Sequence, residues 1–418
     1  MVRNKTLKDF EEVIRKCVKC GVCQAHCPPY LVKKREGAVA RGKIALAAAV
    51  LDGETGIEKR LQEDISLCLM CGSCVKKCPN KVPTDGIIGA MRREITDRNG
   101  LPVMAKLLAG TIGSARMKNT LSKGAAFLRP LWSRKIPQSS GLHLRFGLPG
   151  MENRTVPEPA FSNLFDRVPE FSEGQPGRPV VGFFAGCSIT YIYPEIGEMM
   201  VDILVRMGCS VFLPKNQGCC GIPALSSGHG KLVEELADNN IEVFAGKKVD
   251  WIVTACGSCN GGIGEYYRTL EGADRSFTDK VVDFSVFLEK EGFLEKLLEQ
   301  KRTADPVKVT YHDPCHLKTQ GITREPRDLL RALPYVDFVE MEDADACCGL
   351  GGTFSLYHYD VSKAVGARKL RGLEESGAEY VATTCPGCVM QLQDTINHAG
   401  LKVRAVHILE LLLRMAPD

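Results

Sequence analysis

The sequence predicts an α+β chain in which a helical N-terminal domain precedes two tandem α/β repeats. Two cysteine patterns, each of which occurs twice, indicate this division, and short apolar segments that alternate with amphipathic stretches indicate the α/β half. A chain of 418 residues, 44% of them hydrophobic and 25% charged, is too long for one ordinary core and is expected to form several globular parts. We expect four regions with the bounds 1–100, 101–178, 179–300 and 301–418.

The first cysteine pattern lies in the N-terminal region. Cys17, Cys20, Cys23 and Cys27 precede Pro28 with the spacing C-x2-C-x2-C-x3-C-P, which recurs 51 residues later. In two-cluster ferredoxins this spacing lets three close thiolates hold one [4Fe–4S] cube while the fourth ligates the other, and zinc sites do not use such a run. The expected ligands of the first cube are Cys17, Cys20, Cys23 and Cys78. Those of the second cube are Cys68, Cys71, Cys74 and Cys27.

Helices are expected around these motifs, over residues 37–51 and 84–98, so that the two cubes lie on helices rather than on hairpins. Gly21 and Gly72 fall inside the tight cysteine loops, where a side chain would crowd the cluster. The N-terminal region is therefore predicted to be a helical ferredoxin-type domain.

The second cysteine pattern fills the C-terminal half. Five cysteines in the order C…CCG…C-x2-C occur twice, at an offset of 128 or 129 residues. We call these two sets the first and the second repeat. The first repeat comprises Cys187, Cys219, Cys220, Cys256 and Cys259. The second comprises Cys315, Cys347, Cys348, Cys385 and Cys388.

Apolar segments place these cysteines at the ends of buried strands. Strands are predicted at 180–184 and 251–254 in the first repeat and at 307–311 and 380–383 in the second, each just before a cysteine, with helical stretches such as 195–207 between them. Alternating strands and helices form parallel sheets, whose ligands gather at the carboxyl ends of the strands. Each repeat is therefore expected to bring its cysteines together.

Five thiols are one more than a cube needs, so the cofactor of the repeats stays open at this point. A non-cubane [4Fe–4S] cluster with bridging thiolates, a cube with one spare cysteine, a zinc site and a redox dithiol are the alternatives. His312 and His316 flank Cys315 and are expected to donate hydrogen bonds to cluster sulfurs rather than to ligate iron. Cys209 has no counterpart in the other repeat and is expected to be a core thiol. No residue is predicted to be catalytic.

A basic segment separates the two halves. Residues 101–150 contain eight Lys or Arg and no Asp or Glu. A solvated linker, a docking surface for a partner subunit and a contact with an anionic membrane face are the three interpretations.

The remaining bulk features favour a cytoplasmic chain, with peripheral contact at the inner membrane face left open. The longest apolar run, Ile44–Leu51, is far shorter than the roughly 18 residues of a membrane span, and the first residues lack the apolar stretch of a signal peptide. In a reducing compartment abundant cysteine points to metal binding rather than to disulfides. A net charge of +4 gives no argument for nucleic acid, and no G-x-G-x-x-G fingerprint for flavin or nicotinamide is present.

The twin four-cysteine motif followed by two CCG repeats resembles the iron–sulfur subunits of glycolate oxidase and of FAD-linked D-lactate dehydrogenases. It is also similar to the catalytic D subunit of heterodisulfide reductase and to the C subunit of anaerobic glycerol-3-phosphate dehydrogenase. The resemblance covers residues 7–413. It implies an oxidoreductase complex in which a separate FAD subunit oxidises a 2-hydroxy acid and this chain, not catalytic alone, carries the electrons to a downstream acceptor. The alternatives are disulfide reduction at non-cubane clusters, or a relay between electron-transfer flavoprotein and quinone.

Overall fold

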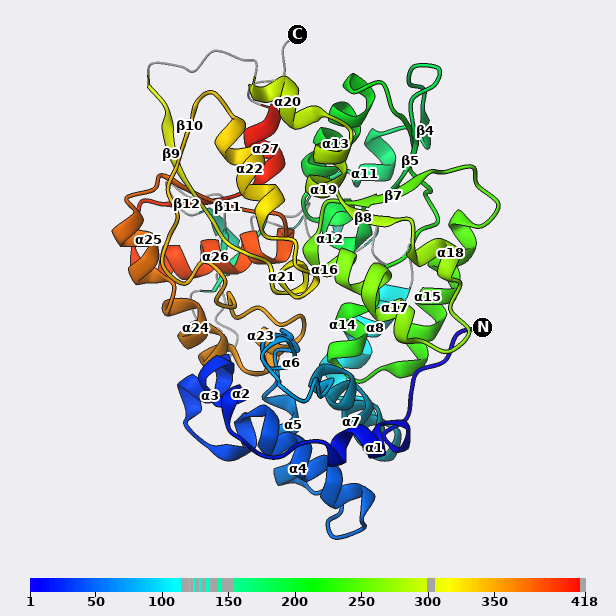
Figure 1. Cartoon of the computed structure of the whole chain (residues 1–418), viewed down its shortest axis with the longest axis vertical. Coiled ribbons are helices and arrows are strands. Elements are labelled where there is room, and N and C mark those ends of the chain that lie inside the picture. The colour runs from blue at the N-terminus through cyan, green and yellow to red at the C-terminus, as the bar shows by residue number, and fades with distance from the viewer. Residues whose placement is uncertain are drawn as a thin grey trace.

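The computed structural model describes residues 1–113, 120, 123–124, 128, 133–135, 142–144, 154–158, 160–298 and 305–413. Figure 1 shows the N-terminal helices below two α/β units that stand side by side, one for each repeat. The predicted α+β class is confirmed, and so is the order of a helical region followed by two α/β repeats.

The N-terminal region is built from short helices. They are η1 (Lys8–Phe10), α1 (Glu11–Arg15), α2 (Val22–His26), α3 (Pro28–Lys33), η2 (Glu36–Ala38), α4 (Ala40–Leu51), α5 (Lys59–Ser66), α6 (Ser73–Lys76) and α7 (Thr84–Asn99). The expected helices at 37–51 and 84–98 correspond to α4 and α7. Apolar side chains at helical spacing, such as Ile44 on α4 and Ile87 and Met91 on α7, form the core between them.

The two α/β units repeat one strand order. The first has the order β4-β6-β5-β7-β8 and the second β10-β9-β11-β12, so that β6-β5-β7-β8 matches the second sheet strand for strand. The strands of the first are β4 (Phe171–Ser172), β5 (Val180–Phe184), β6 (Ser210–Phe212), β7 (Trp251–Thr254) and β8 (Val281–Asp283). Those of the second are β9 (Val307–Tyr311), β10 (Val336–Phe338), β11 (Tyr380–Thr383) and β12 (Arg404–His407). All pairings are parallel except that of β4 with β6.

Helices connect and cover the strands. In the first unit these are α12 (Gly186–Tyr191), α13 (Pro194–Arg206), α14 (Ile222–Ser226), α15 (Gly230–Phe244), α16 (Gly257–Cys259), η3 (Asn260–Tyr266), α17 (Tyr267–Thr269), α18 (Arg275–Thr278), α19 (Phe284–Lys290) and α20 (Phe293–Leu298). In the second they are α21 (Cys315–Gln320), α22 (Arg324–Ala332), α23 (Phe354–Tyr357), α24 (Tyr359–Ala367), α25 (Leu370–Ser376), α26 (Pro386–Ala399) and α27 (Ile408–Leu413). Buried side chains from both units belong to one continuous hydrophobic core.

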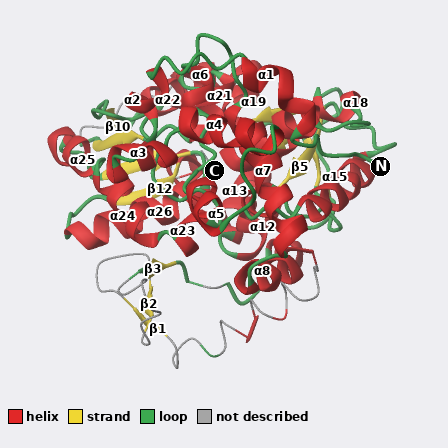
Figure 2. Ribbon diagram, turned by 90° about the horizontal axis from the view of Figure 1, so that it is seen from below, coloured by secondary structure: helices red, strands yellow, loops and turns green. Residues whose placement is uncertain are grey.

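The region between the halves contains more structure than a linker. It holds α8 (Val103–Gly113), β1 (Ser133–Lys135), β2 (Leu142–Leu144), β3 (Thr155–Val156) and α11 (Leu164–Arg167). The small sheet β1–β3 lies at one side of the molecule (Figure 2), and Thr155 on β3 donates its backbone N–H to Asp394 of the second unit at 2.7 Å. Strand β4 joins the first sheet, which therefore starts before residue 179. Most of the basic segment 101–150 lies outside the described residues, so its three interpretations stay predictions.

Within the described part of the chain, no helix is both long and apolar enough to cross a membrane.

Candidate iron–sulfur centres

Two small cavities in the N-terminal region bring the first eight cysteines together. Three thiols from one motif and the fourth thiol of the other line each cavity, as the ferredoxin spacing predicts. The first cavity is lined by Cys17, Cys20, Cys23 and Cys78. The second is lined by Cys27, Cys68, Cys71 and Cys74. Cys74 also reaches the first cavity. Four thiols around one enclosed space are the donor set that a [4Fe–4S] cluster requires.

Backbone geometry explains how each cysteine loop closes on its cavity. Gly21 and Gly72 begin α2 and α6 with φ of +89° and +68°, the left-handed conformation that a side chain disfavours. Each turn points the following short helix, with its cysteine, back at the cavity. The backbone N–H of Met70 donates to the Cys68 sulfur at 3.4 Å, an interaction that stabilises a thiolate.

The two cavities differ in their distance from solvent. The first reaches the surface, where Cys20 is exposed and the flanking Val18 and Val22 are 68% and 44% exposed. The second lies deeper and borders the second repeat, since Cys71 packs against the buried Cys315 and Cys347. Hydrogen bonds from Cys315 and then Cys347 lower the pKa of Cys71. One N-terminal site is thus open to solvent, and the other touches the α/β half.

The cysteines of the first repeat gather where β5, β6 and β7 end. The sulfurs of Cys187 and Cys219 are 3.5 Å apart. Hydrogen bonds from Cys219 and then Cys259 lower the pKa of Cys220, which favours a thiolate there. Gly186, at φ +67°, leaves no room for a side chain, because a Cβ there would lie 2.6 Å from the Cys259 sulfur.

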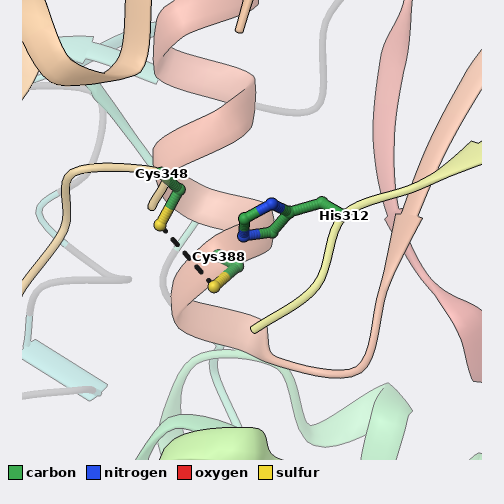
Figure 3. Close-up of side chains that lie close together, drawn as sticks. All are labelled: His312, Cys348 and Cys388. Carbon is green, nitrogen blue, oxygen red and sulfur yellow. Dashed lines mark hydrogen bonds between the residues drawn. The ribbon is translucent and has the colours of Figure 1, made fainter. Parts of the chain in front are cut away.

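The five cysteines of the second repeat form a connected set. Cys347 contacts both Cys315 and Cys348. Cys315 and Cys347 also reach Cys71 of the N-terminal region. The Cys348 and Cys388 sulfurs lie 3.6 Å apart beside His312 (Figure 3). Cys385 contacts Cys388 and also faces the first repeat.

The two repeats meet at their cysteines. The Cys256 and Cys385 sulfurs are 3.9 Å apart, and the hydroxyl of Ser258 is 3.6 Å from the Cys385 sulfur. The backbone N–H of Gly257 donates to Thr384 at 3.0 Å and fixes this approach. A cavity of about 500 Å³ opens here, and Cys71 and every cysteine of the two repeats except Cys219 line it.

Comparison with known proteins agrees with this arrangement. A family described as "4Fe-4S dicluster domain" matches residues 13–82, and one described as "Cysteine-rich domain" matches residues 181–264 and 309–393. The probable glycolate oxidase iron-sulfur subunit of Bacillus subtilis is 31% identical over 96% of this chain and 93% of its own length. The chain belongs to this family of iron–sulfur subunits.

Two other relatives of this chain have names that differ from that of the Bacillus subtilis protein. A subunit of a fumarate reductase (CoM/CoB) from Methanothermobacter marburgensis is 27% identical over 97% of this chain and 73% of its own length. Lactate utilization protein A of Halalkalibacterium halodurans is 32% identical over 56% of this chain and 96% of its own length. The dicluster match means that the N-terminal region is built for two [4Fe–4S] clusters.

The histidines of the iron–sulfur subunit lie in different surroundings. His312 is fully buried beside Cys348 and Cys388, whereas His316 lines the large cavity and packs on Gly261. Burial lowers the pKa of both rings, which favours their neutral forms. Two further histidines lie away from these sites: His26 is exposed, and His229 caps α15 by accepting the backbone N–H of Leu232.

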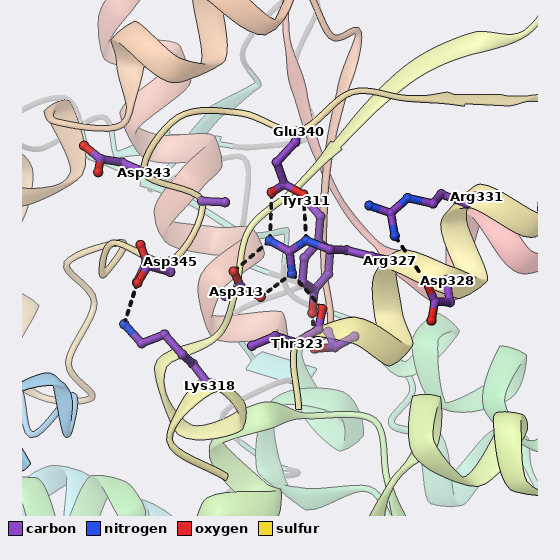
Figure 4. A network of polar contacts seen from close by, with 12 residues as sticks. Tyr311, Asp313, Lys318, Thr323, Arg327, Asp328, Arg331, Glu340, Asp343 and Asp345 are labelled. Atoms are coloured by element: carbon purple, nitrogen blue, oxygen red, sulfur yellow. Dashed lines mark hydrogen bonds and ion pairs between the residues drawn. The ribbon is translucent and has the colours of Figure 1, made fainter. Parts of the chain in front are cut away.

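Polar contacts hold the loop that carries His312 and Cys315. Arg327 on α22 donates to both carboxylate oxygens of Asp313, at 2.7 and 2.9 Å, and to Glu340 on its other side (Figure 4). Its guanidinium also stacks on the Tyr311 ring, 5.2 Å from the centroid. Residues 311–315 are therefore fixed from one side by α22.

Sequence reasoning missed two buried lysines beside the cysteines. Lys43 lies near Cys68 and Cys27, and Lys369 lies near Cys348 and Cys315; each is at most 1% exposed. No motif marks these positions, because only tertiary packing buries them. Cys209 lies in the hydrophobic core and lines none of these cavities, in line with the expectation of a core thiol.

Proposed function

We propose that this chain is the electron-transfer subunit of a flavin-linked dehydrogenase for a 2-hydroxy acid, glycolate or D-lactate. It would carry electrons from a separate FAD subunit to a downstream acceptor. The observation that carries the proposal is the continuous series of cysteine sites, from exposed Cys20 through Cys71 to the contact of Cys385 with Cys256. The names of the relatives from Bacillus subtilis and Halalkalibacterium halodurans support the substrate class.

We infer that eighteen cysteines serve as cluster ligands, the eight of the N-terminal motifs and the ten of the two repeats. Iron–sulfur clusters supply one-electron transfer, which a flavin needs to pass on its electron pair singly. For the repeats we propose [4Fe–4S] clusters of non-cubane form. The connected set of five thiols in the second repeat, one more than a cube needs, supports an opened cluster with bridging thiolates rather than a compact cube.

The surface around Cys20 is our proposed contact for the FAD subunit. The exposed Val18 and Val22 border the first cavity and give a partner apolar area to bury. Electron transfer requires close approach, and this N-terminal site is the one open to solvent. The basic segment 101–150 remains a second candidate for docking, or for contact with an anionic membrane face.

A second candidate function is reduction of a disulfide at the repeats, with the chain itself as the catalyst. The large cavity between the two cysteine sets favours it, because cysteines of both repeats line one space, where clusters held by both could act on one disulfide. A relay between electron-transfer flavoprotein and quinone is a third candidate, and among the described residues we find no feature that favours it over the other two.

Reconstitution with the partner tests the main proposal. We expect the anaerobically purified chain to bind no FAD and to oxidise neither glycolate nor D-lactate, and to pass electrons to an artificial acceptor once the FAD subunit is added. Val18→Asp with Val22→Asp should weaken that assembly while the iron content stays unchanged. Turnover of a thiol–disulfide pair by the chain alone would favour the second candidate instead.

A further inference from the structure

The imidazole of His312 is buried with cysteine sulfur as its polar neighbour. It has no exposed surface, and apart from the Cys348 thiol no described residue offers either ring nitrogen a hydrogen-bond partner. A buried polar group without a good hydrogen-bond partner is unfavourable, so native proteins rarely leave one unsatisfied. The ring faces the sulfurs of Cys348 and Cys388, and the three donor atoms lie within 4.8 Å of one another (Figure 3).

The backbone holds the ring in this place. The backbone N–H of His312 donates to the carbonyl of Ala382 at 2.9 Å. The backbone N–H of Asp313 donates to the carbonyl of Ala344 at 3.1 Å. Asp313 is also held by both arms of Arg327. The backbone that carries the imidazole is therefore fixed on both sides beside the two sulfurs.

The first repeat lacks this nitrogen. The residue 128 positions before His312 is Phe184, which is equally buried but offers no ligand atom. All five cysteines are retained at an offset of 128 or 129 residues, so the two repeats differ in their donor sets rather than in their fold.

We propose that His312 is a nitrogen ligand of the metal centre in the second repeat, next to Cys348 and Cys388. Two thiolates about 2.3 Å from one tetrahedral metal ion lie about 3.8 Å apart, close to the 3.6 Å between these sulfurs. Cys315 and Cys347 also contact Cys71 and Cys385 also contacts Cys256, so Cys348 and Cys388 are the two thiols that the ring faces. The inference rests on the proposed cluster in this repeat, in which the imidazole would take an iron position that a bridging thiolate fills in the first repeat.

A neutral imidazole in place of an anionic thiolate changes the redox property of the centre. Replacement of cysteine by histidine on an iron raises its reduction potential, as in Rieske centres, because less negative charge opposes the added electron. The second repeat is therefore expected to be reduced at a higher potential than the all-thiolate first repeat.

Pulsed EPR on the full chain with ¹⁵N-labelled histidine tests the ligand. In the reduced wild type we expect a strongly coupled histidine nitrogen on one centre. His312→Phe, which copies the first repeat, should abolish this coupling and lower the potential of that centre, while His316→Phe should leave the coupling intact. His312→Cys, which keeps a donor atom, should retain the iron content of the wild type without the nitrogen signal.

Three results would overturn the inference. They are the absence of histidine coupling in the wild type, its survival in His312→Phe, and a weak coupling typical of a hydrogen-bond donor only. Electron transfer from the FAD subunit, measured on the same samples, distinguishes a failure of the proposed function from a failure of the His312 ligand. Its failure in the wild type contradicts the proposed function, whereas normal transfer without a nitrogen signal contradicts the ligand alone.

Discussion

Two buried lysines lie beside cysteine sites without belonging to any ligand set. Lys43 donates to the carbonyl of Gly37 at 2.9 Å, and Lys369 donates to that of Asp343 at 2.7 Å. A buried ammonium is unfavourable unless negative charge compensates it, and the nearby thiols offer that compensation as thiolates. At the position 128 residues before Lys369 the first repeat has Ile241. The second repeat therefore contains both a buried cation and a buried imidazole that the first repeat lacks.

Lys369→Met should lower the reduction potential of the second-repeat centre. The loss of a nearby positive charge makes the reduced form of the centre less favourable. If the charge changes the equilibrium constant of one-electron reduction tenfold, the reduction potential falls by on the order of 60 mV. Because Lys369 is no proposed ligand, the iron content should stay as in the wild type. An EPR-monitored redox titration measures the shift, with exposed Lys363→Met on α24 as the control. Equal potentials in the two variants would show that the charge of Lys369 does not reach the centre.

At the level of elements, helix α22 fixes the connection between β9 and α21. Arg327 on α22 is 14% exposed and its partner Asp313 only 4%, so their ion pair is largely withdrawn from water. Breaking such a pair by removing one member leaves a buried charge unpaired. Arg331, on the same helix, pairs with Asp328 near the surface at 52% exposure.

Arg327→Met should destabilise the second repeat by about 3–5 kcal/mol, the cost of an unpaired buried carboxylate. Arg331→Met is the matched control and should cost about 0–1 kcal/mol, as exposed pairs do. Chemical unfolding of the two variants measures the difference. Iron analysis should show a loss confined to the second repeat for Arg327→Met, because Asp313 lies between His312 and Cys315. Similar losses of stability and of iron in both variants would mean that the ion pair of Arg327 with Asp313 does not support the cysteine loop.

The elements differ in how well the sequence predicts them. The strands at 180–184 and 251–254 agree residue for residue with β5 and β7, because buried parallel strands favour near-continuous apolar segments. Strand β4 escaped prediction, since two residues at a sheet edge carry no pattern. The contact of Cys71 with Cys315 could not be predicted either, because it depends on how distant segments pack. The same holds for the burial of Lys369.

Across the whole molecule, the cysteine sites join three parts of the chain. The repeats approach each other at Cys256 and Cys385, and His407 of the second reinforces this junction through its contact with the Ala255 carbonyl of the first at 3.0 Å. The N-terminal region closes on the second repeat through Cys71, and Lys76 donates to the carbonyl of Lys318 there at 2.7 Å. Along the cysteine contacts the second repeat therefore connects the N-terminal sites with the first repeat, while Arg92 on α7 also donates to the Ser226 carbonyl of the first unit at 2.8 Å.

Two equivalent glycines allow the N-terminal junction to be tested. Gly21 and Gly72 occupy the same place in the duplicated motif, and both have left-handed φ angles. A Cβ on Gly72 would lie 2.6 Å from Cγ2 of Thr319 on α21, the helix that begins with Cys315. A Cβ on Gly21 would lie 3.1 Å from the end of the Arg41 side chain and 3.4 Å from the end of the Gln24 side chain, both of which can move aside.

Alanine at either position should cost roughly 1–2 kcal/mol of stability, because an alanine in the left-handed conformation is strained. Only Gly72→Ala should also push α21 away and lengthen the gap between Cys71 and Cys315. We therefore expect both variants to keep the iron content of the wild type, and only Gly72→Ala to lose magnetic coupling between the N-terminal and second-repeat centres in the EPR spectrum. Its electron transfer into the second repeat, followed by rapid-mixing kinetics, should slow in parallel. An equal loss of magnetic coupling in Gly21→Ala would indicate that strain in the cysteine loop, rather than the contact with α21, weakens the coupling. That result would contradict the inferred contact between the centres through Cys71 and Cys315.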